Sequence, residues 1–210
     1  MFTLTDADWI NPPATYSVGD DTLVIVTDPG TDLWQRSYYG FRNDNAPCLL
    51  QAIEANFTLT VKVQFEYKNL FDQCGLAIYI DTDTWFKASV EYENQSIARL
   101  GSVVTNHGYS DWASVDIALP ETIWFRLHRR GPDFLVESSA DGVNFQQMRI
   151  FHLHVLGATT EAMGQANPPK AATAAVPVGL YACSPGESSF KATFSELEME
   201  ACRWQPHSAM

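Results

Sequence analysis

The feature that most constrains the fold is a series of short apolar and β-branched segments that recur about every ten residues. Val, Ile, Thr and aromatic residues dominate these segments, and turn residues such as Asp28-Pro29-Gly30 and Asp141-Gly142 separate them. Strands at this spacing, without long helical periodicity, are typical of an antiparallel β-sandwich. The sequence therefore predicts an all-β fold with strands at 22–27, 48–53, 57–67, 74–80, 85–92, 101–106, 115–119, 123–129, 134–139, 147–154, 178–183 and 189–199.

One stretch departs from the strand pattern. Residues 157–176 are rich in Ala, Gly and Pro and contain Asn167-Pro168-Pro169, which prevents a long helix. We expect an extended excursion between two strands. No internal repeat and no linker divides the 210 residues, so we expect a single domain over 1–210.

Charge and targeting signals limit the partners. The chain has 25 acidic and 13 basic residues, a formal net charge of −12, which argues against nucleic acid. Its N-terminus has no basic cluster, and an apolar run of the roughly 20 residues needed to span a bilayer is missing. The four cysteines have no Cys-x-x-Cys spacing. We therefore expect a cytoplasmic protein with reduced thiols and no membrane association.

The two faces of the central strands differ in chemistry, because alternate side chains of a strand point in opposite directions. One set is apolar and predicts the core: Cys74, Leu76, Ile78, Ile80, Phe86, Ala88, Val90, Ile123, Phe125 and Leu127. The opposite set mixes aromatic rings with hydrogen-bonding groups: Gln73, Tyr79, Trp85, Lys87, Glu91, Trp124, Arg126 and His128.

Two interpretations of the mixed face stay open. Aromatic rings beside hydrogen-bonding side chains form a platform that holds a sugar ring or a planar ligand. Alternatively, loops including 157–176 cover this face and the aromatic rings form a second small core. Lys87 and Glu91 lie too far apart along one strand to pair, so we expect Arg126 as the partner of Glu91. Trp112 either walls one end of the groove or belongs to a capped loop entrance.

Several motifs in the right order carry a family resemblance over roughly residues 4–199. They are Asp32-Leu33-Trp34-Gln35-Arg36, Tyr39-Gly40-Phe41, Asp72-Gln73-Cys74-Gly75-Leu76, Trp85-Phe86-Lys87-Ala88, Ser102-Val103-Val104-Thr105-Asn106 and Ser110-Asp111-Trp112. With these motifs the chain resembles the "regulation of enolase" family of concanavalin A-like domains of unknown function. The resemblance implies a jelly-roll sandwich of two curved antiparallel sheets and no particular reaction. Similar sandwiches serve as lectins, so sugar binding follows by analogy of fold.

Three hypotheses about function follow. The first is a non-catalytic protein that binds a carbohydrate or similar polar ring compound on the concave face of one sheet. The second is a regulatory protein that docks onto a metabolic enzyme of the enolase type. The third and least favoured is a glycoside-active enzyme that uses Glu91. We expect no catalytic residue, metal or cofactor, and the predicted ligand-binding residues are Trp34, Gln73, Tyr79, Trp85, Lys87, Glu91, Trp112, Arg126 and His128.

Overall fold

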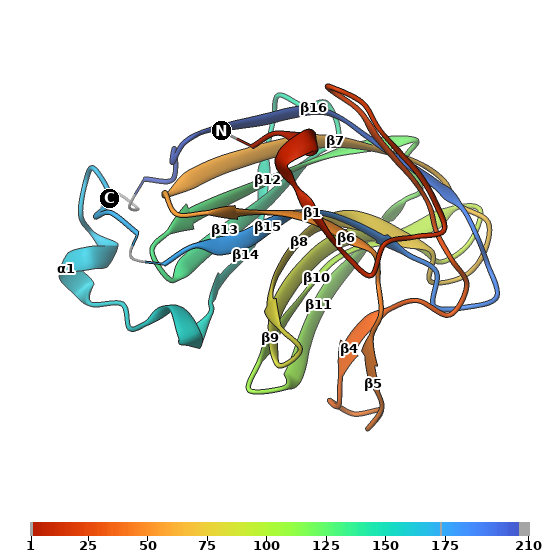
Figure 1. Ribbon diagram of the computed structural model, residues 1–210, viewed down its shortest axis with the longest axis horizontal. Coiled ribbons are helices and arrows are strands. Elements are labelled where there is room, and N and C mark those ends of the chain that lie inside the picture. Colours follow the sequence, from red (N-terminus) through yellow and green to blue (C-terminus); the bar gives the residue numbers. More distant parts are fainter. Residues whose placement is uncertain (1, 173, 206–210) are drawn as a thin grey trace.

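Two antiparallel sheets of seven strands pack face to face in the computed structural model, which describes residues 2–172 and 174–205 (Figure 1). The front sheet has the order β1 (Asp8–Ile10), β6 (Cys48–Ile53), β15 (Val176–Cys183), β8 (Gln73–Asp81), β9 (Thr84–Tyr92), β10 (Ile97–Asn106) and β11 (Tyr109–Ala118). The back sheet has the order β14 (Gln146–His152), β13 (Asp133–Ser139), β12 (Thr122–Arg130), β7 (Phe57–Glu66), β16 (Lys191–Ala201), β3 (Leu23–Val26) and β2 (Thr15–Val18). The predicted all-β jelly-roll sandwich of two curved antiparallel sheets is confirmed.

A small third element stands outside the sandwich. Strands β4 (Leu33–Gln35) and β5 (Arg42–Asp44) form a separate hairpin below the front sheet in Figure 1. Its turn places Arg36, Tyr38 and Gly40 in the left-handed backbone region, with φ of 55°, 62° and 78°. Two non-glycine residues in that region make this an unusually constrained turn.

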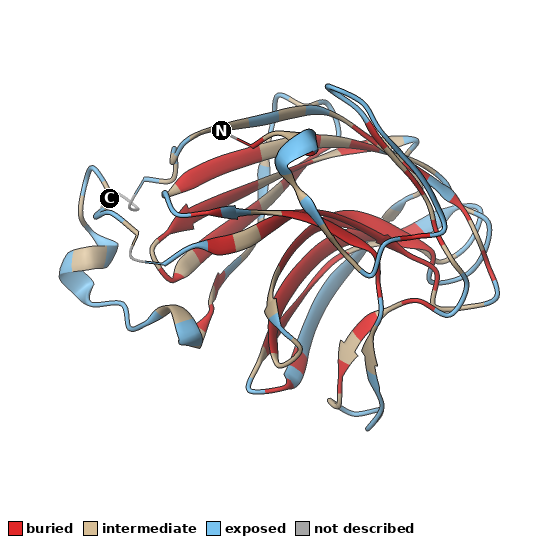
Figure 2. Cartoon of the chain, in the orientation of Figure 1, coloured by how far each residue is buried: buried red, intermediate tan, exposed pale blue. Residues whose placement is uncertain are grey.

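The space between the sheets is filled by the apolar sets predicted from the alternation. Cys74, Leu76 and Ile78 of β8 meet the apolar side chains of the back sheet in one core, and the strands that flank it are buried (Figure 2). Phe86 of the front sheet stacks on Phe151 of the back sheet with ring centroids 4.1 Å apart. The predicted inward faces of β8, β9 and β12 are therefore confirmed, and burial of these side chains is the main force that holds the layers together.

The excursion 157–176 lies at the far side of the molecule from the β4–β5 hairpin (Figure 1). It contains one short helix, α1 (Glu161–Gly164), which Thr160 caps by accepting a hydrogen bond from the Met163 amide. Two buried arginines attach the excursion to the sandwich. Arg129 Nη2 donates to the Ala174 carbonyl at 2.6 Å, and Arg130 Nη2 donates to the Ala166 carbonyl. The alternative interpretation, in which this segment covers the aromatic face of the front sheet, is therefore wrong.

Candidate ligand-binding cleft

The register of the front sheet brings five polar or aromatic side chains onto its outer face. Gln73 of β8 lies opposite Glu91 of β9, and Glu91 lies opposite Arg99 of β10. Two rows further along, beyond the row of Ser89, Lys87 lies opposite Val103, which lies opposite Trp112 of β11. Opposite residues of an antiparallel pair point to the same face, so these side chains form one continuous surface.

This surface is the floor of a cleft of about 550 Å³. That volume lies within the range of roughly 300–1,000 Å³ typical of small-molecule sites. The lining residues come from the front sheet, the β4–β5 hairpin and two loops: Asp32, Trp34, Tyr39, Phe41, Asn43, Phe71, Gln73, Lys87, Ser89, Glu91, Arg99, Gly101, Ser102, Val103, Trp112, Pro185 and Gly186.

An ion pair and a separate set of hydrogen bonds hold the side chains of the floor in place. Lys87 Nζ lies 3.0 Å from Asp32 Oδ1, and the side chains of both residues are largely buried, with 5% and 15% exposed. Gln73 Nε2 donates to Glu91 Oε2 at 3.1 Å, while the Tyr181 hydroxyl donates to Gln73 Oε1 at 3.2 Å. The amide of Gln73 is therefore fixed from both sides.

The charges on the floor respond to burial in opposite ways. Burial is the largest single effect on Lys87 and disfavours its ammonium, but the surrounding acidic groups, led by Asp32, together outweigh burial and raise the pKa of Lys87. Burial raises the pKa of Glu91 from 4.5 to about 7, and Lys87 opposes this shift only in part. The floor therefore holds a fixed ion pair beside a carboxyl group that is half protonated near neutral pH.

Aromatic side chains form the walls above this floor. Trp34, Tyr39 and Phe41 come from the hairpin, where Tyr39 and Phe41 stack with ring centroids 5.3 Å apart. Trp112 on β11 is 41% exposed, and Phe71 in the loop before β8 is 42% exposed. Exposed rings of this size around a polar floor are typical of binding sites rather than of plain solvated surface.

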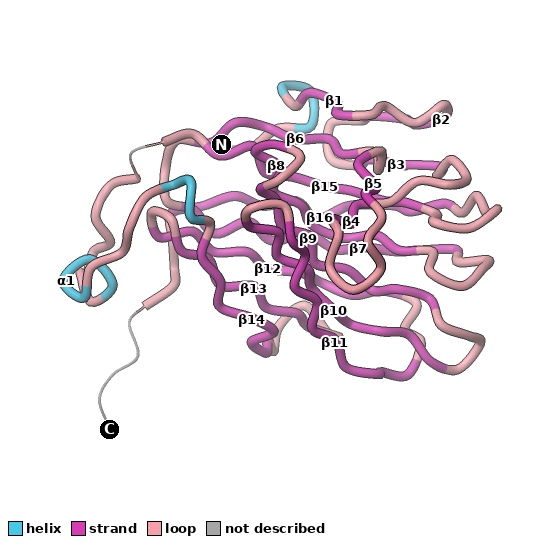
Figure 3. The backbone as a smooth tube through the Cα atoms, turned by 90° about the horizontal axis from the view of Figure 1, so that it is seen from below, coloured by secondary structure: helices cyan, strands magenta, loops and turns pink. Residues whose placement is uncertain are grey.

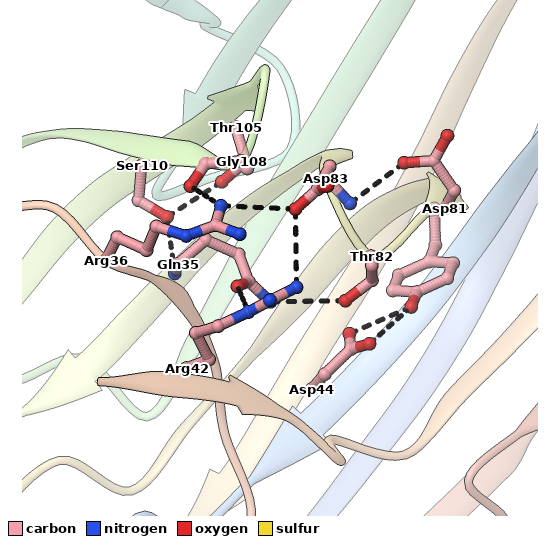
Figure 4. Close-up of polar contacts among 11 residues, drawn as sticks. Gln35, Arg36, Arg42, Asp44, Asp81, Thr82, Asp83, Thr105, Gly108 and Ser110 are labelled. Atoms are coloured by element: carbon pink, nitrogen blue, oxygen red, sulfur yellow. Dashed lines mark hydrogen bonds and ion pairs between the residues drawn. The ribbon is translucent and has the colours of Figure 1, made fainter. Parts of the chain in front are cut away.

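The hairpin is fastened to the two turns at one end of the front sheet (Figure 4). Arg36 Nη1 donates to the Gly108 carbonyl at 2.6 Å and lies 3.3 Å from Asp83 Oδ1, which Arg42 Nη2 approaches at 3.5 Å. The backbone amide of Gln35 donates to Ser110 Oγ at 2.9 Å. These contacts fix the position of the wall that carries Tyr39 and Phe41.

Two of the predicted site residues lie under the hairpin instead of in the cleft. Trp85 is fully buried in a second small cluster with Leu33 and Ala46. The Tyr79 hydroxyl donates to the carboxylate of Asp44, 2.8 Å from each oxygen, and burial followed by this contact raises the pKa of Tyr79. Part of the mixed face is thus covered, by the β4–β5 hairpin and not by 157–176, and another part lines the cleft.

Two further predicted residues lie on the other sheet. Arg126 and His128 belong to β12, on the outer face of the back sheet, so the expected pairing of Arg126 with Glu91 is wrong. His128 instead contacts Glu137 Oε2 through Nε2 at 2.9 Å and Thr58 Oγ1 through Nδ1 at 2.8 Å. Alternation identifies the face of a strand but not the sheet to which the strand belongs.

The cleft therefore brings together five of the nine predicted residues: Trp34, Gln73, Lys87, Glu91 and Trp112. Residues not predicted as ligand-binding complete it, above all Asp32, Tyr39 and Phe41. For Tyr39 and Phe41 the signal in the sequence is the aromatic run Tyr38-Tyr39-Gly40-Phe41, an unusual composition for a turn that faces solvent.

Two further observations concern residues 2–172 and 174–205. No group of three or more His, Cys, Asp or Glu side chains is arranged there to hold a metal ion. The helices in this part of the chain are too short and too polar to cross a membrane.

Comparison with known proteins places the chain in a family. Residues 9–202 match the family model described as "Protein of unknown function (DUF1349)". Regulation of enolase protein 1 of Saccharomyces cerevisiae is 29% identical over 203 residues, covering 94% of this chain and 91% of that protein. The crystal structure of a functionally unknown protein from Saccharomyces cerevisiae superposes with a TM-score of 0.80 at 28% identity, covering 95% of this chain and 98% of that one.

A more distant match concerns the fold alone. The GH43 BlXynB protein from Bacillus licheniformis gives a TM-score of 0.65 at 16% identity, over 93% of this chain and 37% of that one. Because the family model covers almost the whole chain, this protein belongs to the DUF1349 family and is a relative of yeast Regulation of enolase protein 1.

Proposed function

We propose that this protein is a non-catalytic binding protein whose cleft takes a neutral polar ring compound, with a carbohydrate as the best fit. The observation that carries the proposal is the combination of a hydrogen-bonding floor with aromatic walls in one cleft. A sugar ring presents hydroxyl groups at its edge and C–H groups on its faces. The floor supplies partners for the first and the walls supply partners for the second.

The floor has hydrogen-bonding capacity to spare. The Lys87 ammonium has three N–H donors, and Asp32 Oδ1 is the hydrogen-bond acceptor that the described residues supply to it. Glu91 Oε2 accepts from Gln73, which leaves Oε1 for a ligand hydroxyl. Lys87 can donate to one hydroxyl of a ring compound, and Glu91, four residues further along the same strand, can accept from another.

Charge favours a neutral ligand over an anionic one. Asp32 neutralises Lys87 at 3.0 Å, and Arg99 is engaged by Glu93 at 3.2 Å and by Asp116 at 3.7 Å. The net charge of −12 adds a long-range repulsion for anions.

The test is a glycan array followed by calorimetry, with one matched pair of tryptophan variants. Trp112→Ala removes a wall of the cleft, whereas Trp124→Ala removes a tryptophan from the back sheet. We expect Trp112→Ala to weaken sugar binding about tenfold, or ~1.4 kcal/mol, and Trp124→Ala to leave it unchanged. Absence of binding to every glycan at millimolar concentration would overturn the proposal.

A second candidate function has one observation in its favour. The tip of the hairpin exposes Tyr38 by 96%, next to the exposed Tyr39 and Phe41. Exposed aromatic rings are frequent anchors of protein interfaces, and a relative is named for regulation of enolase. We therefore propose, as the alternative, docking onto a metabolic enzyme of the enolase type through this tip.

This alternative is tested with purified enolase and a second matched pair. Tyr38→Ser should abolish co-elution in size-exclusion chromatography, and Tyr16→Ser, at a partly exposed tyrosine of the back sheet, should not. If the two proteins elute separately at micromolar concentration, the docking function is wrong.

A further inference from the structure

The shape of the cleft restricts which part of a glycan can enter. Resting on the proposed function, we infer that the cleft recognises the end of a sugar chain or a free mono- or disaccharide, and not an internal segment of a polymer. The inference follows from the three closed sides and one open side of the cleft.

The hairpin closes the first side, along the strand direction. Rows of the front sheet that hold Gln73, Glu91 and Lys87 line the cleft. The next row holds Tyr79, Trp85 and Thr105, and there the cleft has ended because the hairpin occupies the space. Trp85 is fully buried under Leu33 and Ala46, and Figure 3 shows the hairpin in front of the front sheet.

The opposite end is closed by two loops that are locked together. Phe71 and the Pro185–Gly186 pair line the cleft there. The buried carboxylate of Asp72 joins the two loops, accepting from the Asn69 amide at 2.9 Å and from Ser184 Oγ at 2.8 Å. Phe71 itself has φ of 73°, and its amide donates to the Tyr92 carbonyl at 2.9 Å, so the ring is held at the rim.

The third side is closed by the segment that leads into the hairpin. Pro29 bridges to Ser184, the Gly30 amide donates to the Gly186 carbonyl at 3.1 Å, and the Thr31 amide donates to the Ser184 carbonyl at 3.0 Å. Asp32 then binds Lys87 on the floor. The front sheet continues beyond this segment, but its Tyr181 and Cys183 side chains are fully buried.

The fourth side is open. There the cleft reaches β11, the last strand of the front sheet (Figure 3). Trp112 of this strand lines the cleft and is 41% exposed. Asp116, four residues further along β11 on the same face, has 68% of its side chain exposed. A polymer that lies along the floor and crosses the site needs two open sides, and the described residues leave one. The terminal sugar therefore enters beside Trp112 and the rest of the chain stays in solvent.

The experiment compares ligand length by calorimetry. The probes are maltose, cellobiose, xylobiose and mannobiose, each with the hexasaccharide of its own series. Every linear molecule has one non-reducing end, so recognition of an end gives equal affinity per molecule for the short and the long member. We expect the dissociation constants of a binding pair to agree within about twofold, and Trp112→Ala to weaken both members by the same factor.

The possible failures are distinguishable. A hexasaccharide that binds more than about tenfold tighter than its disaccharide would show that internal units occupy the cleft, which overturns the end-recognition inference and supports the proposed function. Absence of binding in all four series and on the glycan array would overturn the proposed function, and the inference with it.

Discussion

Replacing Glu91 by glutamine tests the electrostatics of the cleft floor directly. The carboxyl group faces Lys87, Asp32, Arg99 and Glu93, and its pKa rises from 4.5 to about 7 on folding, mainly through burial. Each pKa unit is worth ~1.4 kcal/mol, so the ionised Glu91 destabilises the folded state by at most about 3.5 kcal/mol. Glutamine has the same shape, keeps an acceptor for Gln73 and carries no charge.

The sign of the effect follows from proton binding. Between pH 4.5 and about 7 the folded protein holds a proton on Glu91 that the unfolded chain has released. The contribution of Glu91 to wild-type stability therefore declines as pH rises through this window, and the decline is complete above about 7. We expect wild type to lose up to about 3 kcal/mol between pH 5 and pH 8 relative to Glu91→Gln.

Urea unfolding followed by tryptophan fluorescence at pH 5 and pH 8 measures this difference. Glu121→Gln, at an exposed position between β11 and β12, is the matched control and should follow wild type at both pH values. Parallel pH profiles of wild type and Glu91→Gln would refute the reasoning, because they would mean that the carboxyl group is as well solvated in the folded protein as in the unfolded chain.

Two further predictions concern buried groups. Asp72→Ala should lower the free energy of unfolding by about 3 kcal/mol in urea titrations. The substitution removes the hydrogen-bond acceptor of the Lys68 and Asn69 backbone amides and of the Ser184 and Ser188 hydroxyls. A loss below ~1 kcal/mol would contradict the bridging role of Asp72. Ellman's reagent should react with at most one thiol of the native protein, the partly exposed Cys202, and with four thiols after unfolding. The reason is that Cys48, Cys74 and Cys183 are buried, and burial raises the pKa of Cys48 and Cys74 to about 12. Rapid reaction of two or more native thiols would show that the cores open readily.

The long strands and their inner faces could be predicted because they depend on a local pattern. A period of two is visible within ten residues, and it correctly assigns Leu76, Phe86 and Phe125 to the core. The cysteines are free, as their spacing predicts. Strands β4 and β5 were missed because three residues each are too few to show a period.

The composition of the cleft depends on contacts that no local pattern records. Arg126 and Lys87 have the same outward orientation in their strands, yet their strands belong to different sheets. Trp85 and Trp112 are both outward-facing tryptophans, but the hairpin covers one and leaves the other exposed. Which of them meets a ligand depends on where the hairpin folds back, and that position is set by Asp83 and Gly108, far away in the sequence.

The fastening of the hairpin makes the shape of the cleft adjustable from a distance. Its aromatic wall is carried by β4 and β5, but the anchors are two short turns of the front sheet that line no part of the cleft. Substitutions at Asp83 or around Gly108 would tilt the wall and change the width of the entrance while every ligand-contacting side chain stays the same. Relatives that differ in these turns could thus prefer different sugars with identical cleft residues, and directed evolution of specificity could begin at the turns.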